Sequence, residues 1–378
     1  MFKNYFIKIL ILILICVCLY LLYQIFFQYE KMQTKTQDSY SKGIYIPTYF
    51  STKDGNAQWL GTRRAFEIYD VFYSPMNEIV IVMPMQKDIE HPVISINGGE
   101  PLEKHACIHH HSFVYVAKVM GPYEPNIDIR INSVLYKDIH VNKLPDYDGK
   151  IIMTTCVKNE DKYVKQWIRY NKSLGIQHFV FYDNAPKDVS TLANTLAEDI
   201  ADGTVLLVQW PYTYDFAQFV QMNHSLYGFR NAKYIGYFDV DEYINPQCEY
   251  YDIDELLNHI MEKKSVSKDN ICSIRFMNRF FYNPDDKSVD GFEFLKITNC
   301  GEIVYGMREK MFVLPRNTNM VSVHTVTDFK ENMKQIDSDI VDVYFNHYAY
   351  LNKPDRGRDR TNHRDNSIHA KLEKFGIL

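Results

Sequence analysis

The chain has 378 residues, of which 46% are hydrophobic and 15% aromatic, so it is long enough to bury a sizeable core and to form two domains. Its 47 acidic and 42 basic side chains give a formal net charge of −5. The sequence has no basic tract of the kind that nucleic-acid binding needs, so we expect no nucleic-acid partner.

The N-terminal segment departs from this ordinary globular composition. Residues 9–29 carry no charged side chain, and as a helix they would span roughly 31 Å, close to the thickness of a bilayer core. A cleaved signal peptide is the alternative, but its apolar region is shorter and ends at a small-residue site that this segment lacks. We therefore expect a cytoplasmic tail (1–8), a transmembrane anchor (9–29) and a polar stem (30–43). The charges that flank the anchor give only a weak bias toward this single-pass type II orientation.

Residues 44–148 are expected to form a β-rich accessory domain. The runs 65–82, 92–96, 112–119 and 127–141 are rich in β-branched and aromatic residues and are separated by Pro, Gly and Asn. His105, His109, His110 and His111 invite interpretation as metal ligands, but consecutive residues of a strand or turn point in different directions. A solvated loop is the better prediction for these histidines.

The seven cysteines indicate neither a zinc site nor a disulfide framework. Cys16 and Cys18 fall in the expected anchor, which leaves Cys107, Cys156, Cys248, Cys272 and Cys300. Their number is odd and their spacings are wide, so we expect one or two disulfides at most.

From residue 149 the pattern alternates between strands and helices. The runs 151–157, 178–184, 204–210 and 234–239 are typical of buried strands, and 159–175, 192–200 and 218–231 of helices. Gly175 stands where a C-terminal helix cap belongs. This alternation predicts an α/β domain over 149–352 with a mainly parallel sheet, followed by a C-terminal tail or helix over 353–378. Ligands of such sheets bind beyond the carboxyl ends of the strands.

Three carboxylates follow the last of these strands, in the stretch GYFDVDEYI. If the chain stays extended there, Asp239 and Asp241 point to one face and Glu242 to the other. Two carboxylates on one face repel each other unless a cation lies between them or water solvates both. Oxygen ligands suit Mg²⁺ or Mn²⁺, and the diphosphate of a sugar nucleotide could complete the coordination. A D-x-D sequence by itself is usually a solvated turn, but its position after an apolar strand favours a metal site.

Several blocks of this sequence strongly resemble glycosyltransferase family 92. They are CVKNEDKYVKQWIRYNKSLGIQHFVFYDN (156–184), YIGYFDVDEYINP (234–246), REKMFVLP (308–315), VSVH (321–324) and NHY (346–348). The resemblance covers residues 151–350, and the related family 2-like transferases share the same blocks. It implies a GT-A fold, which is Rossmann-like, and an inverting, metal-dependent hexosyltransferase. The implied donor is UDP-galactose, the acceptor a glycan on protein or lipid, and the cofactor Mn²⁺ or Mg²⁺.

The resemblance also implies roles for single residues. Those expected beside the base and ribose of the nucleotide are Cys156, Val157, Asn159 and Glu160, with Asp183 contacting the uridine. Asp239 and Asp241 would bind the metal and orient the diphosphate. Lys310 would face the phosphates, and His324 or His347 would complete the metal shell.

Simpler roles stay open for some of these residues. Asn159 could cap the following helix, Lys310 could be a surface charge, and a lone histidine is more often structural than a ligand. Trp167 is expected to pack in the core. Inversion requires a base for the acceptor proton, and the candidate carboxylates are Asp290, Glu293, Glu302 and Glu309. Glu309 is preferred because it adjoins a matching block.

Two other classes of protein stay open. One is a non-catalytic glycan-binding protein with the same fold, and the other is a metal-dependent phosphodiesterase or nucleotidyltransferase that uses the same carboxylate pair. In a eukaryotic cell the anchor would place the catalytic domain in the lumen of the Golgi or the secretory pathway.

Overall fold

The computed structural model describes residues 40–41, 43–51, 58–59, 62–63, 67–84, 92–106, 112–186, 189–212, 217–247, 252–282, 297–306, 308–348, 363–374 and 376. The chain divides into two units, residues 1–41 and 42–378, and the described part of the first is the short strand β1 (Tyr40–Ser41). The expected anchor over 9–29 lies outside the described residues. Among the described helices, none is both long and apolar enough to cross a membrane.

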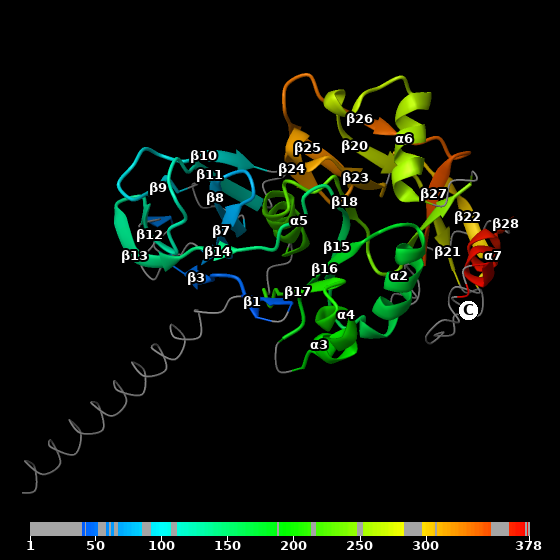
Figure 1. Cartoon of the computed structure of the whole chain (residues 1–378), viewed down its shortest axis with the longest axis horizontal. Coiled ribbons are helices and arrows are strands. Elements are labelled where there is room, and N and C mark those ends of the chain that lie inside the picture. The colour runs from blue at the N-terminus through cyan, green and yellow to red at the C-terminus, as the bar shows by residue number, and fades with distance from the viewer. Residues whose placement is uncertain are drawn as a thin grey trace, which may run out of the picture. The chain divides into compact units, whose positions relative to one another are not determined.

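A twisted central sheet organises the second unit (Figure 1). Its strands lie in the order β2 (Ile44–Tyr45), β17 (Val205–Gln209), β16 (His178–Asp183), β15 (Ile151–Val157), β18 (Tyr234–Tyr237), β23 (Lys310–Val313), β20 (Ile271–Phe276) and β26 (Lys334–Asp337). The strands from β2 to β18 are parallel, β23 is antiparallel to both of its neighbours, and β26 is parallel to β20. This confirms the predicted α/β architecture with a mainly parallel sheet.

Helices cover both faces of the central sheet. One face packs against α2 (Asp161–Ser173), α3 (Leu192–Thr195), α4 (Ala197–Ala201) and α6 (Ile253–Lys263), which share one core cluster with it. The C-terminal helix α7 (Ser367–Lys374) adds Ile368 and Leu372 to the same cluster. The other face packs against α5 (Ala217–Gly228), whose residues are nearly all buried. Of two 3₁₀ turns, η3 (Lys268–Asn270) immediately precedes β20, and η5 (Pro315–Asn317) contacts β20 and immediately precedes the strand that begins at Thr318.

Helix α2 ends as the sequence predicts. Gly175 has a φ of +85°, and its N–H bonds to the carbonyl of Lys172 at 3.0 Å, while the N–H of Ile176 bonds to that of Asn171 at 3.2 Å. A Cβ atom at Gly175 would also collide with the carboxylate of Asp252. Glycine is therefore required both by the backbone conformation and by the close approach of α6.

The region before residue 149 is built from short strands, as expected. One sheet has the order β10 (Glu103–Ala106), β11 (Ser112–Lys118), β8 (Glu78–Pro84), β7 (Asp70–Ser74) and β14 (Asn142–Lys143). Another has the order β13 (Val134–His140), β12 (Asn126–Ile131) and β9 (Ile94–Ile96), and two small pairs are β3 (Phe50–Ser51) with β6 (Glu67–Ile68) and β4 (Gln58–Trp59) with β5 (Thr62–Arg63). One face of the five-stranded sheet packs on α5. Both regions belong to one compact unit. The predicted domain boundaries stay predictions.

A further sheet follows the central one, and the sequence patterns did not predict it. It has the order β19 (Glu242–Pro246), β27 (Val343–His347), β21 (Asn278–Phe281), β22 (Asn299–Val304) and β28 (His363–Arg364). A hairpin of β24 (Thr318–Ser322) and β25 (Thr325–Phe329) lies beside α5. The sheet led by β19 carries two of the side chains described next.

Candidate active site

Three parallel strand ends meet at the carboxyl edge of the central sheet. In the strand register Val157 of β15 is opposite Asp183 of β16, and Thr154 of β15 is opposite Tyr237 of β18. Burial raises the pKa of the Cys156 thiol, and the nearby carboxylates of Asp239, Glu160 and Asp183 raise it further. The carboxylates at these strand ends thus add negative charge to the surroundings of Cys156.

The acidic stretch is a turn between two sheets. β18 ends at Tyr237, residues 240 and 241 form a turn, and β19 begins at Glu242 in the other sheet. The N–H of Glu242 bonds to the carbonyl of Asp239 at 3.0 Å, and the Glu242 carboxylate accepts the N–H of Asp239 at 2.8 Å. The prediction that residues 238–242 stay extended with Glu242 facing away is therefore wrong, because these bonds fold Glu242 back onto the turn.

Helix α2 holds the start of β19 in place. The indole N–H of Trp167 donates to the carbonyl of Glu242 at 3.0 Å, and the hydroxyl of Tyr170 donates to the carbonyl of Ile244 at 2.5 Å. Trp167 is fully buried between Phe179 and Phe181, which confirms its predicted place in the core. Its ring nitrogen has the additional role of positioning Glu242.

Asp241, Glu242 and His347 form a group that could hold a metal ion. One ligand atom from each lies within 4.8 Å of the others. His347 Nε2 is 3.7 Å from Asp241 Oδ2, and its Nδ1 is 3.7 Å from Glu242 Oε1. His347 ends β27, and Glu242, its partner in the strand register, begins β19. The pairing of these two neighbouring strands thus brings together residues that are more than a hundred positions apart in the chain.

Charge coupling within this group shifts each of its pKa values. Burial opposes ionisation of Asp241, but His347 and Lys310 outweigh it and hold the pKa of that carboxyl below its usual range. Burial raises the pKa of Glu242 to about 7, against the opposing effect of Lys310. Burial disfavours a charged His347, but Asp241 and Glu242 raise its pKa overall. A divalent cation would relieve the repulsion between the two carboxylates.

The donor atoms of this group fit a divalent metal. Two carboxylates and one imidazole offer both oxygen and nitrogen ligands. Such a mixed set suits Mn²⁺ better than Mg²⁺, because Mg²⁺ usually takes oxygen ligands alone. The Nδ1 atom of His347 is buried and has no hydrogen-bond partner. A buried polar atom without a partner is costly, and coordination would satisfy it.

Lys310 and Asp239 form a second charged group beside the first. The Lys310 ammonium is 2.7 Å from Asp239 Oδ2 and 3.1 Å from Glu242 Oε2. Gln218, in the first turn of α5, donates to Asp239 Oδ1 at 2.9 Å. Both oxygens of Asp239 therefore have protein donors, and Asp239 lies outside the three-residue group. Lys310 is only 3% exposed, so the alternative that it is a surface charge is wrong.

The two candidate histidines occupy different positions. His324 Nδ1 is 2.9 Å from the carbonyl oxygen of Glu309, and the ring lies outside the group that contains His347. Burial and then Lys310 lower the pKa of His324, so the ring favours its neutral form. In the tautomer that donates from Nδ1, its Nε2 atom keeps a lone pair.

The candidate bases also differ in their surroundings. Glu309 is 3% exposed, and its Oε1 atom is buried without a hydrogen-bond partner. Glu302 is 69% exposed and pairs with His363 at 2.5 Å. Asp290 and Glu293 lie outside the described residues. Of the two described candidates, Glu309 is therefore the one whose carboxylate is buried from solvent.

The residues expected on the nucleotide side lie at the ends of β15 and β16. Asp183 accepts hydrogen bonds from the hydroxyl of Ser190 at 2.5 Å and the N–H of Ala185 at 3.1 Å. Burial raises its pKa, and the bond from Ser190 opposes this. Asn159 has a φ of +59°, and Glu160 is the residue at the N-cap of α2. The alternative role of Asn159 as the helix cap is therefore wrong, because Asn159 is held in the left-handed region one residue earlier.

Sequence reasoning missed Gln218 and misplaced Glu242. Gln218 stood in a stretch expected to be helical, with no signal that its amide contacts Asp239. A signal for Glu242 was present, since an acidic residue directly after the aspartate pair is followed by a short apolar run. That run is β19, whose pairing partner is distant in sequence.

Comparison with known proteins supports a sugar-transferring class for this mixed α/β fold. The model of glycosyltransferase family 92 matches residues 153–375, more than half of the chain, and the chain belongs to this family. The matched range includes every predicted functional residue named above as well as helix α7.

Two curated relatives carry the same family name. A glycosyltransferase family 92 protein of Ricinus communis is 22% identical over 205 residues, which are 53% of this chain and 35% of the relative. One of Oryza sativa subsp. japonica is 24% identical over 200 residues, which are 52% of this chain and 32% of the relative. The matched region thus spans about a third of the length of these relatives.

Solved structures give only distant likenesses. The bifunctional glycosyltransferase WbbM has a TM-score of 0.22 at 14% identity, covering 40% of this chain and 26% of its own. The galactosyltransferase LgtC has a TM-score of 0.28 at 12% identity, and the match covers 62% of this chain and 96% of LgtC. The mannosyltransferase Ktr4p of S. cerevisiae has a TM-score of 0.20 at 12% identity, and the match covers 37% of this chain and 42% of Ktr4p. Likenesses this low support no argument about donor or mechanism.

Proposed function

We propose that the chain is a metal-dependent glycosyltransferase with a GT-A catalytic region, which moves a hexose from a nucleoside diphosphate donor to a glycan acceptor. Membership of family 92 supports sugar transfer. The observation that carries the metal part is the convergence of Asp241, Glu242 and His347 at the end of the central sheet. UDP-galactose is the proposed donor, on the strength of the sequence resemblance.

The proposed cofactor is Mn²⁺, with Mg²⁺ as the second choice. Asp241, Glu242 and His347 would hold it, and a bound ion would stabilise the negative charge of the diphosphate leaving group. Asp239 is 37% exposed while Lys310 and Gln218 fix its orientation, so it is proposed as a contact to the donor. Lys310 adds a fixed positive charge next to that contact. The sequence resemblance also offered His324 as a metal ligand, but His324 lies outside this group, so it is not included in the proposed metal site.

The nucleotide is proposed to bind over the ends of β15 and β16. The residues there are Cys156, Val157, Asn159, Glu160 and Asp183. Support comes from the carboxyl edge of the central sheet, which β15 and β16 share with β18. Strand β18 pairs with β15 and leads into the acidic turn. The diphosphate would then extend from this edge toward Lys310 and the metal group.

Glu309 is proposed as the base for an inverting transfer. Its carboxylate would take the proton of the acceptor hydroxyl as that oxygen attacks the anomeric carbon and the bond from carbon to the phosphate oxygen breaks. The products are the new glycoside and the nucleoside diphosphate, and the proton stays on Glu309 until water removes it. The buried Oε1 atom, which has no hydrogen-bond partner, supports this role.

Attachment to a membrane through residues 9–29 also remains a proposal. It rests on the length and apolar composition of that segment alone. A single-pass type II protein of the Golgi or secretory pathway, with its catalytic region in the lumen, is the proposed arrangement in a eukaryotic cell.

A panel of sugar nucleotides tests the function. The protein is incubated with each donor and a mixture of glycan acceptors, and the released nucleotide is identified by chromatography. Release of nucleoside diphosphate that depends on acceptor and is fastest with UDP-galactose supports the proposal. Release of nucleoside monophosphate would instead indicate a phosphodiesterase, and glycan binding without any release would indicate a binding protein.

A further inference from the structure

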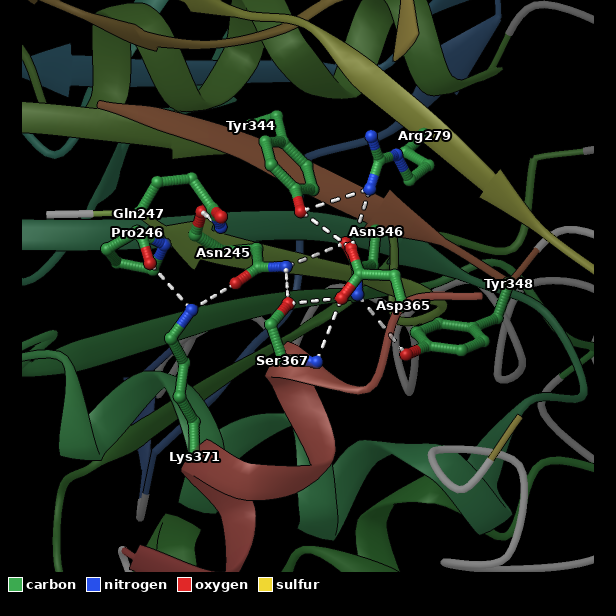
Figure 2. Close-up of polar contacts among 10 residues, drawn as sticks. All are labelled: Asn245, Pro246, Gln247, Arg279, Tyr344, Asn346, Tyr348, Asp365, Ser367 and Lys371. Atoms are coloured by element: carbon green, nitrogen blue, oxygen red, sulfur yellow. Dashed lines mark hydrogen bonds and ion pairs between the residues drawn. The ribbon is translucent and has the colours of Figure 1, made fainter. Parts of the chain in front are cut away.

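A polar network covers one face of the strand pair that carries Glu242 and His347. Along β27, Tyr344 and Asn346 alternate with Phe345 and His347, so the first two point away from the metal group. Asn245 of β19 is the register partner of Tyr344 and shares its face. Figure 2 shows that the C-terminal segment, with helix α7, approaches this face with its polar side chains.

Asp365 is the centre of this network. One carboxylate oxygen accepts a hydrogen bond from the guanidinium of Arg279 in β21 at 2.8 Å and another from the Tyr344 hydroxyl at 2.6 Å. The other accepts the N–H of Ser367 at 2.8 Å and its hydroxyl at 2.5 Å. Asp365 is 9% exposed, and its four donors come from β21, β27 and the start of α7. One side chain therefore joins three elements.

The network continues from α7 to the end of β19. Lys371 donates to the side-chain oxygen of Asn245 and to the carbonyl of Pro246. The Asn245 amide donates to Ser367 Oγ at 2.8 Å and to Asn346 Oδ1 at 3.1 Å. Asn346 immediately precedes His347, so this cross-strand bond lies next to the pairing of His347 with Glu242. Both strands are thus fixed to α7 and to each other.

The apolar side of α7 strengthens the attachment. Ile368 and Leu372 are buried in the core cluster that also contains Tyr243 and Tyr348. Polar contacts on one side and core packing on the other leave the helix a single position on the sheet. A slip of one residue between β19 and β27 would turn Glu242 and His347 to opposite faces, and this attachment resists it.

We propose that Asp365 and Lys371 are positioning residues, which use helix α7 to hold β19 and β27 in the register that places Glu242 opposite His347. The strand register is observed in the structure. The part of this inference that rests on the proposed function is that the ligand held by Glu242 and His347 is a metal ion. Neither residue touches the metal group, and their effect on it passes through Asn245, Asn346 and Tyr344.

Two measurements on the full chain test this proposal, with the variants Asp365→Asn and Lys371→Met. The first is the Mn²⁺ dissociation constant by isothermal titration, and the second is amide hydrogen exchange in β19 and β27. Asp337→Asn is the control, because Asp337 also pairs with an arginine, Arg275, through bonds of 2.7 and 3.0 Å, but on β26. All measurements are made at a temperature where circular dichroism shows each variant folded.

We expect both variants to weaken Mn²⁺ binding by about tenfold, the lower end of the loss seen for residues that orient metal ligands. Exchange should rise in β19 and β27 but not in β15, and the control should match the wild type in both measurements. The proposal is overturned if exchange in β19 and β27 is unchanged in both variants. If the wild type binds no Mn²⁺, the metal proposal fails, while the exchange data still decide the positioning role.

Discussion

Lys310 is the residue whose environment explains most about the acidic turn. Its ammonium lies almost wholly inside the protein between Asp239 and Glu242. Burial would lower the pKa of Lys310, but the two carboxylates outweigh it and raise that pKa above the ordinary value. The lysine therefore stays charged, and it lets three carboxylates approach one another before any metal binds.

Replacing Lys310 should destabilise the fold as well as the site. In Lys310→Met the buried Glu242 loses its counter-charge, and we expect a loss of about 3 kcal/mol in the free energy of unfolding, measured with urea. Lys263→Met is the matched control, because Lys263 also pairs with two aspartates, Asp339 and Asp342, but is itself 37% exposed. Its loss should be much smaller. Equal losses in the two variants would contradict the buried role of Lys310.

The two histidines should separate in their effect on metal binding. His347→Ala removes a proposed ligand, and we expect Mn²⁺ affinity to fall by at least about tenfold, since even outer partners of metal ligands cause losses of that size. His324→Ala should leave Mn²⁺ affinity unchanged, because His324 bonds to the carbonyl of Glu309 outside the group. Titration calorimetry on the metal-stripped protein makes the comparison. The reverse order of effects would show that the wrong histidine has been assigned.

At the scale of elements, local patterns predicted well what local forces determine. The apolar run 151–157 is β15, and the amphipathic stretch ending at Gly175 is α2. β19 escaped prediction because its identity as a strand depends on pairing with β27, about a hundred residues later. The same non-local pairing makes the candidate metal group, so alternation along one strand could identify Asp241 but could not place Glu242 or choose between the histidines.

Helix α7 should contribute stability that depends on pH through Asp365. Burial opposes ionisation of Asp365, but its bonds with Ser367, Tyr344 and Arg279 outweigh it and lower its pKa. An acid with a lowered pKa in the fold stabilises above its unfolded pKa of about 3.9 and loses this effect as the pH falls through the folded value.

The comparison of wild type with Asp365→Asn isolates this contribution. The wild type should be more stable by a constant margin above a pH of about 5, and the margin should shrink below a pH of about 4. Urea unfolding at several pH values between 7 and 3 measures it. A margin that stays constant down to pH 3, or widens there, would contradict the lowered pKa.

At the scale of the whole second unit, the β-rich region and the central sheet share buried polar contacts. Asp70 of β7 accepts the Tyr45 hydroxyl at 2.6 Å and pairs with His224 of α5 at 2.8 Å. The other ring nitrogen of His224 lies 2.7 Å from the hydroxyl of Tyr182 in β16. Asp70 and His224 are fully buried, so a single network links β2, β7, α5 and β16 across the region where the sequence suggested a domain boundary.

We expect the two regions to unfold together. Hydrogen exchange measured along a urea gradient should give the same midpoint for peptides of β8 and of β15, because separating buried hydrogen-bonded partners leaves polar groups unsatisfied and costs free energy. In Asp70→Ala both midpoints should fall together. A lower midpoint for β8 alone would show that the β-rich region is an independent domain, as the composition first suggested.

The dependence of sugar transfer on a metal held at the acidic turn is tested most directly by one assay. Metal-stripped protein is titrated with Mn²⁺ in the presence of UDP-galactose and glycan acceptor, and the release of UDP is followed for the wild type and for Asp241→Asn. Release should begin only as Mn²⁺ is added to the wild type, and the variant should release little at any concentration. Full release without metal, or equal release by the variant, would contradict the metal-dependent site.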